Sequence, residues 1–284
     1  MSSHPEKCPD SINIDLNINR ISRNIFIFCF TAALGFVLLD LFVNYYELTR
    51  FKIIHRFCNI AREDSFASWF GTTQTFMVAL TLWLLFFLLN HAHQPRLKVW
   101  GWFLIAGLFT YIAVDDGIEL HERLGSVFEI AFKPRPYLGL PLSWPSKLLQ
   151  YFPSYPWQVL FAPFFGVMGL FASIFLWREF RLNSVKLLLI LAMACFVIAV
   201  GLDFIEGLNK YHKWNIHTMI LERYGLREYT VRHFSKSLEE FLEMSGITLF
   251  WTAFIQYFKF LPKNNIRFFI KANTHQKRSA ELTV

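Results

Sequence analysis

The sequence predicts an all-α fold, a polytopic integral membrane bundle of six transmembrane helices. Apolar residues make up 54% of the 284 residues and charged residues only 17%. Soluble domains carry about 25% charged residues, so this composition argues against a soluble protein. Six stretches of the chain are also long and apolar enough to cross the hydrocarbon layer, which takes about 20 residues.

The six predicted spans are apolar on all sides rather than along one stripe, which is typical of membrane helices. A polar tail, 1–24, precedes them and a basic tail, 259–284, follows, so 25–258 is expected to form one transmembrane domain. No small-residue cleavage site follows the first span, which predicts a retained signal anchor. The spans are 25–43, 66–89, 99–122, 157–177, 187–206 and 237–258.

Three connections between the spans are long and two are short. Because consecutive spans cross in opposite directions, the long connections 44–65, 123–156 and 207–233 are expected on one face of the membrane. Lys and Arg are slightly denser in the tails and in the short connections 90–98 and 178–186. This bias predicts a multi-pass protein of the cell membrane with both termini in the cytoplasm.

The connection 123–156 differs from the others in composition. Six prolines fall between Pro134 and Pro156, together with several tryptophans and tyrosines. Repeated prolines disfavour a regular helix, and these aromatic side chains favour the headgroup layer. We therefore expect an irregular segment that lies on the membrane surface.

The formal net charge of +7 narrows the choice of partners. The basic residues are scattered over connections and the C-terminal tail, without the stripe that nucleic-acid binding needs. Contact with anionic lipid is the plainer interpretation. The expected partners are therefore the lipid bilayer and a lipid or membrane protein, and no nucleic acid.

Acidic side chains are unusually common at the ends of the predicted spans. An ionised side chain at the bilayer centre costs about 2.5–3.5 kcal/mol on insertion scales, so such residues are expected to face the bundle interior and to be functional. Chain direction places all of them at one end of the bundle, under the long connections. They are Asp40, Asp115, Asp116, Glu119, Glu122, Asp203, Glu206, Glu239, Glu240 and Glu243.

The spacing of these acids predicts that they point in common directions. At about 100° per residue, Asp115, Glu119 and Glu122 line one stripe of the third span. Asp203 and Glu206 share a stripe of the fifth span, and Glu239 and Glu243 share one of the sixth. Helices that each project carboxylates inward can build a carboxylate metal site.

Carboxylates with one or two imidazoles suit Zn, Mn or Fe, so the sequence predicts a divalent metal ion as cofactor. Further imidazoles are available from His212, His217 and His233 in the connection before the sixth span. Asp116 and Glu206 are the predicted catalytic carboxylates, with Glu206 as the base. The predicted metal ligands are Asp115, Asp116, Glu119, His121, Glu122, Asp203, Glu239 and Glu243.

Several of these residues also have structural interpretations. Ser237 and Glu240 form the S-x-x-E pattern of a capping box at a helix start. Asp40 can reach water from its helix end, and Asp203 can mark the membrane boundary. Glu119 can pair with Arg123 one helical turn later, and the three histidines can be ordinary loop residues. In the fourth span, Gly166 and Gly169 favour close approach of another helix.

The stretches VDDGIELHERLG and LEEFLEMSG resemble a group of uncharacterised bacterial multi-pass membrane proteins. The resemblance rests on two motifs that this chain shares with the group. They are D-[DE]-x-x-x-x-H-E in a middle helix and E-E-x-x-E-M-x-G in the last helix. Asp116 stands where glutamate is expected, so a ligand geometry that needs the longer side chain is not implied. The resemblance implies the fold but no activity.

Three functions are compatible with a membrane bundle that carries acidic residues at one end. The first is a metal-dependent, hydrolase-like membrane enzyme that acts on a lipid or membrane-bound substrate. The second is a non-catalytic structural or assembly subunit, in which the acids pair with Arg123, Lys210 or Arg232. The third is a proton-coupled transporter that uses buried carboxylates as a relay, although the inner ends of the spans look too dry for it.

Overall fold

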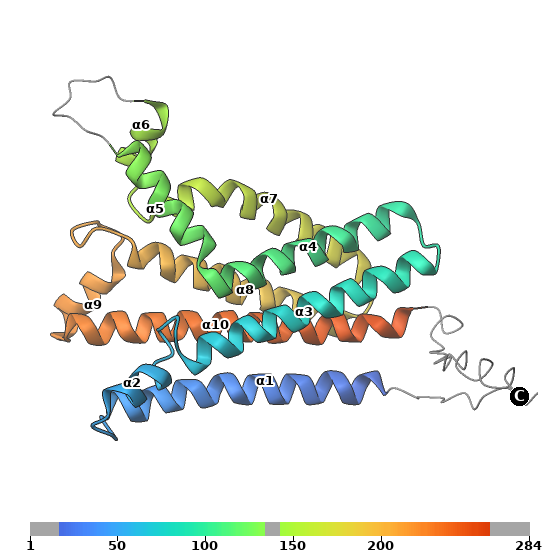
Figure 1. Cartoon of the computed structure of the whole chain (residues 1–284), viewed down its shortest axis with the longest axis horizontal. Helices are drawn as coiled ribbons and strands as arrows, with labels where there is room; N and C mark the ends of the chain where they lie inside the picture. Colours follow the sequence, from blue (N-terminus) through green and yellow to red (C-terminus); the bar gives the residue numbers. More distant parts are fainter. Residues whose placement is uncertain (1–16, 134–142, 262–284) are drawn as a thin grey trace, which may run out of the picture.

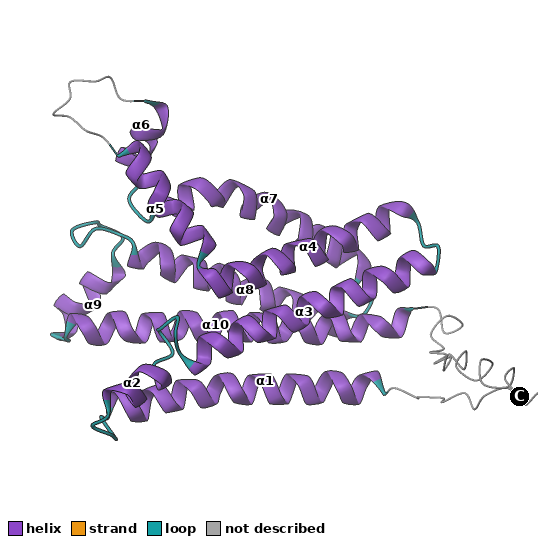
Figure 2. Cartoon of the chain, viewed as in Figure 1, coloured by secondary structure: helices purple, strands orange, loops and turns teal. Residues whose placement is uncertain are grey.

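The computed structural model describes residues 17–133 and 143–261, and all regular structure in these two ranges is helical (Figures 1 and 2). The predicted all-α membrane bundle is thereby confirmed. Its helices are α1 (Ile18–Asp40), α2 (Lys52–Cys58), α3 (Phe66–His91), α4 (Arg96–Ile118), α5 (Leu120–Phe132), α6 (Trp144–Tyr151), α7 (Pro156–Glu179), α8 (Asn183–Glu206), α9 (Ile216–Tyr224) and α10 (Glu228–Tyr257). A π-helical turn, Leu41–Tyr45, continues α1, and a 3-10 turn, Phe258–Phe260, follows α10.

Within the described residues, five helices are long and apolar enough to cross a membrane: α1 with its π-helical turn, α3, α4, α7 and α8. The sixth predicted span corresponds to α10, which does not meet the same measure because glutamate, serine and threonine side chains lower its hydropathy. α10 nevertheless runs lengthwise through the bundle between α8 and α1 (Figure 1). Half of its 30 residues are buried, so it is the central helix.

The apolar core fills one half of the bundle. Leu82 and Leu85 of α3, Trp102 of α4 and Phe254 of α10 are buried there and belong to one cluster, which also takes in α7 and α8. This is the half that the short connections α3–α4 and α7–α8 close (Figure 1). The other half lies toward α2, α5, α6 and α9. There the helices also bury polar side chains, among them Asp40, Asp115 and Glu239.

α1 begins at Ile18, seven residues before the predicted first span, and two further differences change the predicted acidic site. α4 ends at Ile118, because Glu119 takes a left-handed conformation with φ 52° and the chain turns into α5. The predicted stripe of Asp115, Glu119 and Glu122 on one helix is therefore wrong. α10 begins at Glu228, nine residues earlier than the predicted span, so Ser237 lies inside a helix and the predicted capping box is also wrong.

The connection 123–156 is more regular than predicted. α5 continues to Phe132 and α6 begins at Trp144, while the prolines of 134–142 lie outside the described residues. Pro145 is compatible with α6 because it occupies the first turn, where its missing N–H costs nothing. The oxygen of Ser143 caps this helix by accepting a hydrogen bond from the N–H of Ser146.

Glycines allow two close approaches near the acidic end. A Cβ on Gly125 of α5 would lie 2.5 Å from the Cβ of Trp157, and a Cβ on Gly207 would lie 2.3 Å from the oxygen of Ser154. These contacts hold α5 and the segment before α7 against the end of the bundle. In contrast, nothing in the described residues lies within 4 Å of a Cβ built on Gly166 or Gly169, so the predicted close approach there is not made within this chain.

Candidate functional site

The first half of α10 brings one lysine and three glutamates to one face of the helix. Nζ of Lys236 lies 2.7 Å from Oε1 of Glu239 and 3.6 Å from Oε1 of Glu240. Glu243 follows one turn later on the same face and is close enough to interact with Lys236 and Glu240. Lys236 is therefore the cation around which these carboxylates gather.

α8 adds two carboxylates to this group. The amide of Gln158 in α7 donates a hydrogen bond of 2.8 Å to Oδ2 of Asp203. Glu206 is the last residue of α8, one turn nearer the membrane boundary. Burial, together with the charges of Glu206 and Asp203, raises the pKa of the nearby Tyr155 to about 12. The phenol of Tyr155 therefore stays protonated beside these two carboxylates.

α4 and α5 add the pair Asp115 and His121. Oδ1 of Asp115 accepts a 2.8 Å hydrogen bond from the backbone N–H of His121, and Oδ2 accepts one of 2.6 Å from Nδ1 of the ring. Burial opposes a charge on the imidazole, but Asp115, Glu122 and Asp203 outweigh it and raise the pKa of His121. Asp115 thus fixes the first turn of α5 as well as the orientation of the ring.

The break between α4 and α5 places the other predicted ligands, Asp116, Glu119 and Glu122, in different surroundings. Asp116 stays on α4, and its Oδ2 accepts a 3.0 Å hydrogen bond from the hydroxyl of Thr75 in α3. Glu119 pairs with Arg123 at 3.8 Å, as its structural interpretation predicted. Glu122 lies exposed in the first turn of α5, within electrostatic range of His121 and Tyr155.

The acids that the structure brings together are referred to below as the acidic cluster. They interact electrostatically with one another, with Lys236 or with His121, and they come from α4, α5, α8 and α10. The predicted convergence at one end of the bundle therefore holds for most of the acids. The acidic cluster comprises Asp115, Asp116, Glu122, Asp203, Glu206, Glu239, Glu240 and Glu243.

Asp40 lies apart from the acidic cluster and has a structural role. Its Oδ2 accepts hydrogen bonds of 2.8 Å from Nε2 of His233 and 3.1 Å from the hydroxyl of Ser237, and all three side chains are buried. These contacts tie the end of α1 to α10. The alternative that Asp40 reaches out to water is therefore wrong, since the side chain is buried and fully engaged.

A chain of polar contacts continues from Asp40 into the π-helical turn. The amide of Asn44 donates a 2.9 Å hydrogen bond to Oδ1 of Asp40, and its oxygen lies 2.9 Å from Nδ1 of His55 in α2. Nε2 of His55 lies 2.6 Å from the carbonyl oxygen of Thr49. This network fixes the connection between α1 and α3, so it explains the polar residues there without a catalytic role.

The predicted metal site does not take shape in the part of the chain that the structure describes. No three His, Cys, Asp or Glu side chains come together there in a geometry that could hold a metal ion. Lys236 takes the central position between Glu239 and Glu240 instead. The histidines are dispersed: His233 pairs with Asp40, His217 lies in α9, and His212 accepts a hydrogen bond from the N–H of Trp214.

Two buried oxygen atoms at the acidic cluster have no hydrogen-bond donor among the described residues. They are Oε2 of Glu239 and Oε1 of Gln158. Both side chains are nearly inaccessible, at 3% and 5% exposure. An unpaired buried acceptor costs about 1–3 kcal/mol, so both oxygens have acceptor capacity left for a water molecule or another donor.

Sequence reasoning missed four contributors to this site: Lys236, Thr75, Tyr155 and Gln158. The signal for Lys236 was present, because it precedes Glu239, Glu240 and Glu243 by three, four and seven residues and so shares their helix face. No such signal exists for Thr75 or Gln158, since their partners lie 41 and 45 residues away along the chain.

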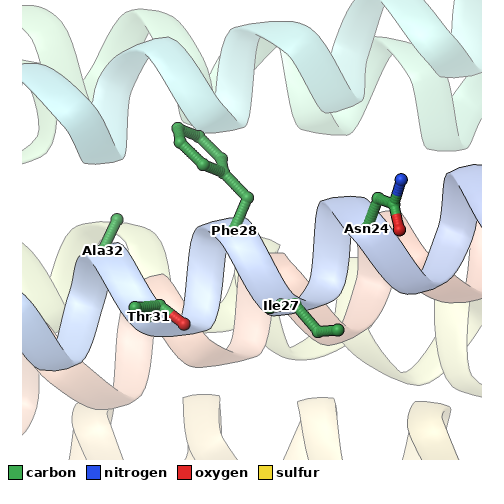
Figure 3. A pocket seen from close by; sticks show the side chains of 5 residues that line it. All are labelled: Asn24, Ile27, Phe28, Thr31 and Ala32. Atoms are coloured by element: carbon green, nitrogen blue, oxygen red, sulfur yellow. The ribbon is translucent and has the colours of Figure 1, made fainter.

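Two cavities lie outside the acidic cluster. One, of about 500 Å³, is an apolar depression on α1 lined by Asn24, Ile27, Phe28, Thr31 and Ala32 (Figure 3). Phe28 points from α1 toward α3, where its ring centroid lies 6.3 Å from that of Phe70. The other cavity, of about 350 Å³, lies between α8, α9 and α10 at the acidic end of the bundle.

Comparison with known proteins identifies a family but no activity. No curated protein and no solved structure matches the chain. The resemblance based on the two acidic motifs therefore stays a prediction. The chain belongs to the family described as domain of unknown function DUF8692, whose model matches residues 25–258.

Proposed function

We propose that the protein is a membrane enzyme with hydrolase-like chemistry that acts on a lipid or another membrane-bound substrate. The observation that carries this proposal is the acidic cluster, in which carboxylates from four helices gather with Lys236 and His121 at one end of the bundle. Burying carboxylates is costly, so a site of this kind is a functional candidate by default.

Glu206 and Asp116 are the acid–base residues of this proposal. Glu206 lies at the end of α8 and can accept a proton from an attacking hydroxyl group. Asp116 lies across the acidic cluster on α4, where Thr75 orients it through the 3.0 Å hydrogen bond. Among the described residues no three His, Cys, Asp or Glu side chains come together as metal ligands, and the proposed chemistry takes no step through a metal ion.

The depth of the acidic cluster favours a substrate held in the membrane. It lies where the long apolar helices end and the short helices α5, α6 and α9 begin (Figure 1). The polar groups of a lipid lie at the same boundary, just outside the hydrocarbon layer. A substrate anchored in the bilayer therefore presents its polar part to these carboxylates.

Lipid turnover by purified protein tests the proposal. Wild-type protein in vesicles of the total lipid of its source membrane is expected to release a lipid product over time, as detected by mass spectrometry. Removing a general acid or base lowers a rate by about 100-fold or more, so Asp116→Asn and Glu206→Gln should abolish most of this turnover. Glu222→Gln, which alters an exposed glutamate of α9, is the matched control.

The second candidate is a non-catalytic assembly subunit, and one observation favours it. Asp115, Asp203 and Glu239 are each held by a neighbouring side chain, so they can serve packing alone. Unchanged turnover in both acid–base variants, or no turnover by the wild type, would contradict the enzyme. Loss of a co-purifying membrane complex in the same variants would then support assembly.

A further inference from the structure

The cavity between α8, α9 and α10 has the character of a lipid-chain pocket. Its wall consists mainly of leucine, isoleucine, valine and phenylalanine side chains, among them Leu202, Ile220 and Phe234. Phe234 and Leu238 are also exposed on the outer surface of α10, so the cavity opens toward the membrane. At about 350 Å³ it lies within the range of small-molecule pockets.

Two polar side chains of this wall contact each other. Nε2 of His217 in α9 lies 2.9 Å from the hydroxyl oxygen of Ser235 in α10. His217 is buried, and burial lowers the pKa of its imidazole, so the ring is neutral near pH 7. The cap of α9 holds the histidine in place, because Oδ1 of Asn215 accepts a 3.1 Å hydrogen bond from the N–H of Thr218.

We infer that Ser235 and His217 are a nucleophile–base pair that cleaves an acyl ester whose hydrocarbon chain occupies this cavity. A hydroxyl within hydrogen-bond reach of a neutral imidazole is the arrangement that activates a serine. Glu206 lies within electrostatic range of His217 and favours the imidazolium that forms during the reaction. The inference rests on the proposed hydrolase-like function and identifies its nucleophile and its substrate class. In this reaction His217 is the base, and Glu206 acts through it by favouring the imidazolium.

The reaction balances with water as the only co-reactant. The oxygen of Ser235 attacks the ester carbonyl carbon while its proton passes to Nε2 of His217. The bond between the carbonyl carbon and the alcohol oxygen then breaks, and the alcohol leaves with that proton. Water attacks the acyl-serine in the same way, releases the fatty acid and restores the hydroxyl of Ser235.

Ser237, two residues further along α10, shows why Ser235 is the better nucleophile. The hydroxyl of Ser237 is engaged with Oδ2 of Asp40 and with the carbonyl of His233, and the side chain is buried away from the cavity. Ser237 does not line the cavity and is only 5% exposed, so a substrate bound in the cavity does not reach its hydroxyl. Ser235, in contrast, lines the cavity and faces an imidazole nitrogen.

A serine-directed fluorophosphonate probe tests the pair in detergent-solubilised full-length protein. The wild type is expected to be labelled on Ser235, as mapped by mass spectrometry of its peptides. Ser235→Ala should remove the label, and His217→Ala should slow labelling by about 100-fold because the base is lost. Ser173→Ala is the matched control, since Ser173 is a helical serine of α7 that bonds only to the backbone oxygen of Gly169 among the described residues.

Peptide mapping on the wild type keeps the test independent of whether a variant folds. Label on another residue, no label, or equal labelling rates in the wild type and His217→Ala would overturn the pair. The two proposals fail separately. Lipid turnover without probe labelling overturns the pair alone, whereas labelling with unchanged turnover in Glu206→Gln and Asp116→Asn overturns only the role of the acidic cluster.

Discussion

Lys236 determines whether the glutamates of α10 are tolerated in the bundle. Its ammonium lies 2.7 Å from a carboxylate that is 4% exposed, while Lys236 itself is 23% exposed. Removing one partner of a buried ion pair leaves the other charge uncompensated, which costs about 3–5 kcal/mol. Most of the stabilising effect of Lys236 therefore depends on Glu239, its shortest contact, and a smaller part depends on Glu240 at 3.6 Å.

We predict that Lys236→Met lowers the midpoint of thermal unfolding in detergent, and that Lys236→Met with Glu239→Gln recovers most of the loss. The single variant strands the charge of Glu239, and the double variant removes it, so about 3 kcal/mol should separate them. Lys147→Met, on the surface helix α6, is the control. Equal midpoints for the single and double variants would mean that the pair does not stabilise the bundle.

His121 makes a contribution to stability that depends on pH. Its pKa in the folded protein is raised above the ordinary value of about 6.5, mainly by Asp115 acting against burial. Folding therefore favours the protonated ring. The stabilisation is fully present below about pH 6.5, and it disappears as the pH rises through the higher pKa of the folded state.

The measurement compares the wild type with His121→Gln across this range. The difference between their unfolding midpoints should be largest near pH 5.5 and should shrink by about pH 9. His212→Gln, which alters a half-buried loop histidine without a carboxylate contact among the described residues, serves as the control. If the difference between the midpoints grew with pH, folding would favour the neutral ring of His121, contrary to this prediction.

At the level of helices, α5 depends on one glycine for its contact with α7. A Cβ on Gly125 would meet both the Cβ and the Cα of Trp157, at 2.5 and 2.7 Å, so backbone as well as side chain would have to move. Gly166 in α7 has open space around it. Alanine is favoured over glycine in a helix by about 1 kcal/mol, which makes the two sites a matched pair.

Gly125→Ala is expected to destabilise the protein by about 1–3 kcal/mol, since it overpacks the contact, while Gly166→Ala is neutral or slightly stabilising. Thermal unfolding and protease cleavage between α4 and α5 measure the two effects. If Gly125→Ala were as stable and as resistant as Gly166→Ala, the α5–α7 contact would not hold α5 in place.

Helices could be predicted where the hydrocarbon layer decides the structure, and not where single hydrogen bonds decide it. Long apolar windows placed α3, α7 and α8 to within four residues, because burial in lipid depends on composition. The break at Glu119 depends on Asp115 capping the N–H of His121, six residues later. Hydrophobic periodicity carries no information about such a contact.

The same reason explains which of the predictions about the acidic residues were confirmed and which were wrong. Chain direction alone brings the acids to one end of the bundle, and most of them lie there together. Whether a given acid turns toward the acidic cluster depends on the rotation of its helix, which composition does not set. Asp40 therefore bonds to His233 of α10, whereas Asp203 accepts a hydrogen bond from Gln158 of α7.

For the whole molecule, the connections at the two ends of the helix bundle bear on how the protein is oriented in the membrane. The connections α3–α4 and α7–α8 lie at one end of the bundle, and α2, α6 and α9 lie at the other (Figure 1). The acidic cluster and the cavity with Ser235 share this second end. The Lys and Arg bias predicts that it faces away from the cytoplasm.

Cysteine labelling in intact cells tests this orientation after the four native cysteines are replaced by serine. Cysteines placed at Leu48, Tyr151 and Tyr211, which are 76%, 82% and 91% exposed, should react with a membrane-impermeant maleimide. A cysteine at Leu97, which is 88% exposed near the start of α4, should react only after the membrane is opened. The reverse pattern would place the acidic cluster on the cytoplasmic face. If the cysteines at positions 48 and 211 reacted from different faces of the membrane, the arrangement of the helices itself would be contradicted. The expected pattern would place any ester cleavage in the outer leaflet, where the cavity beside α9 opens to lipid.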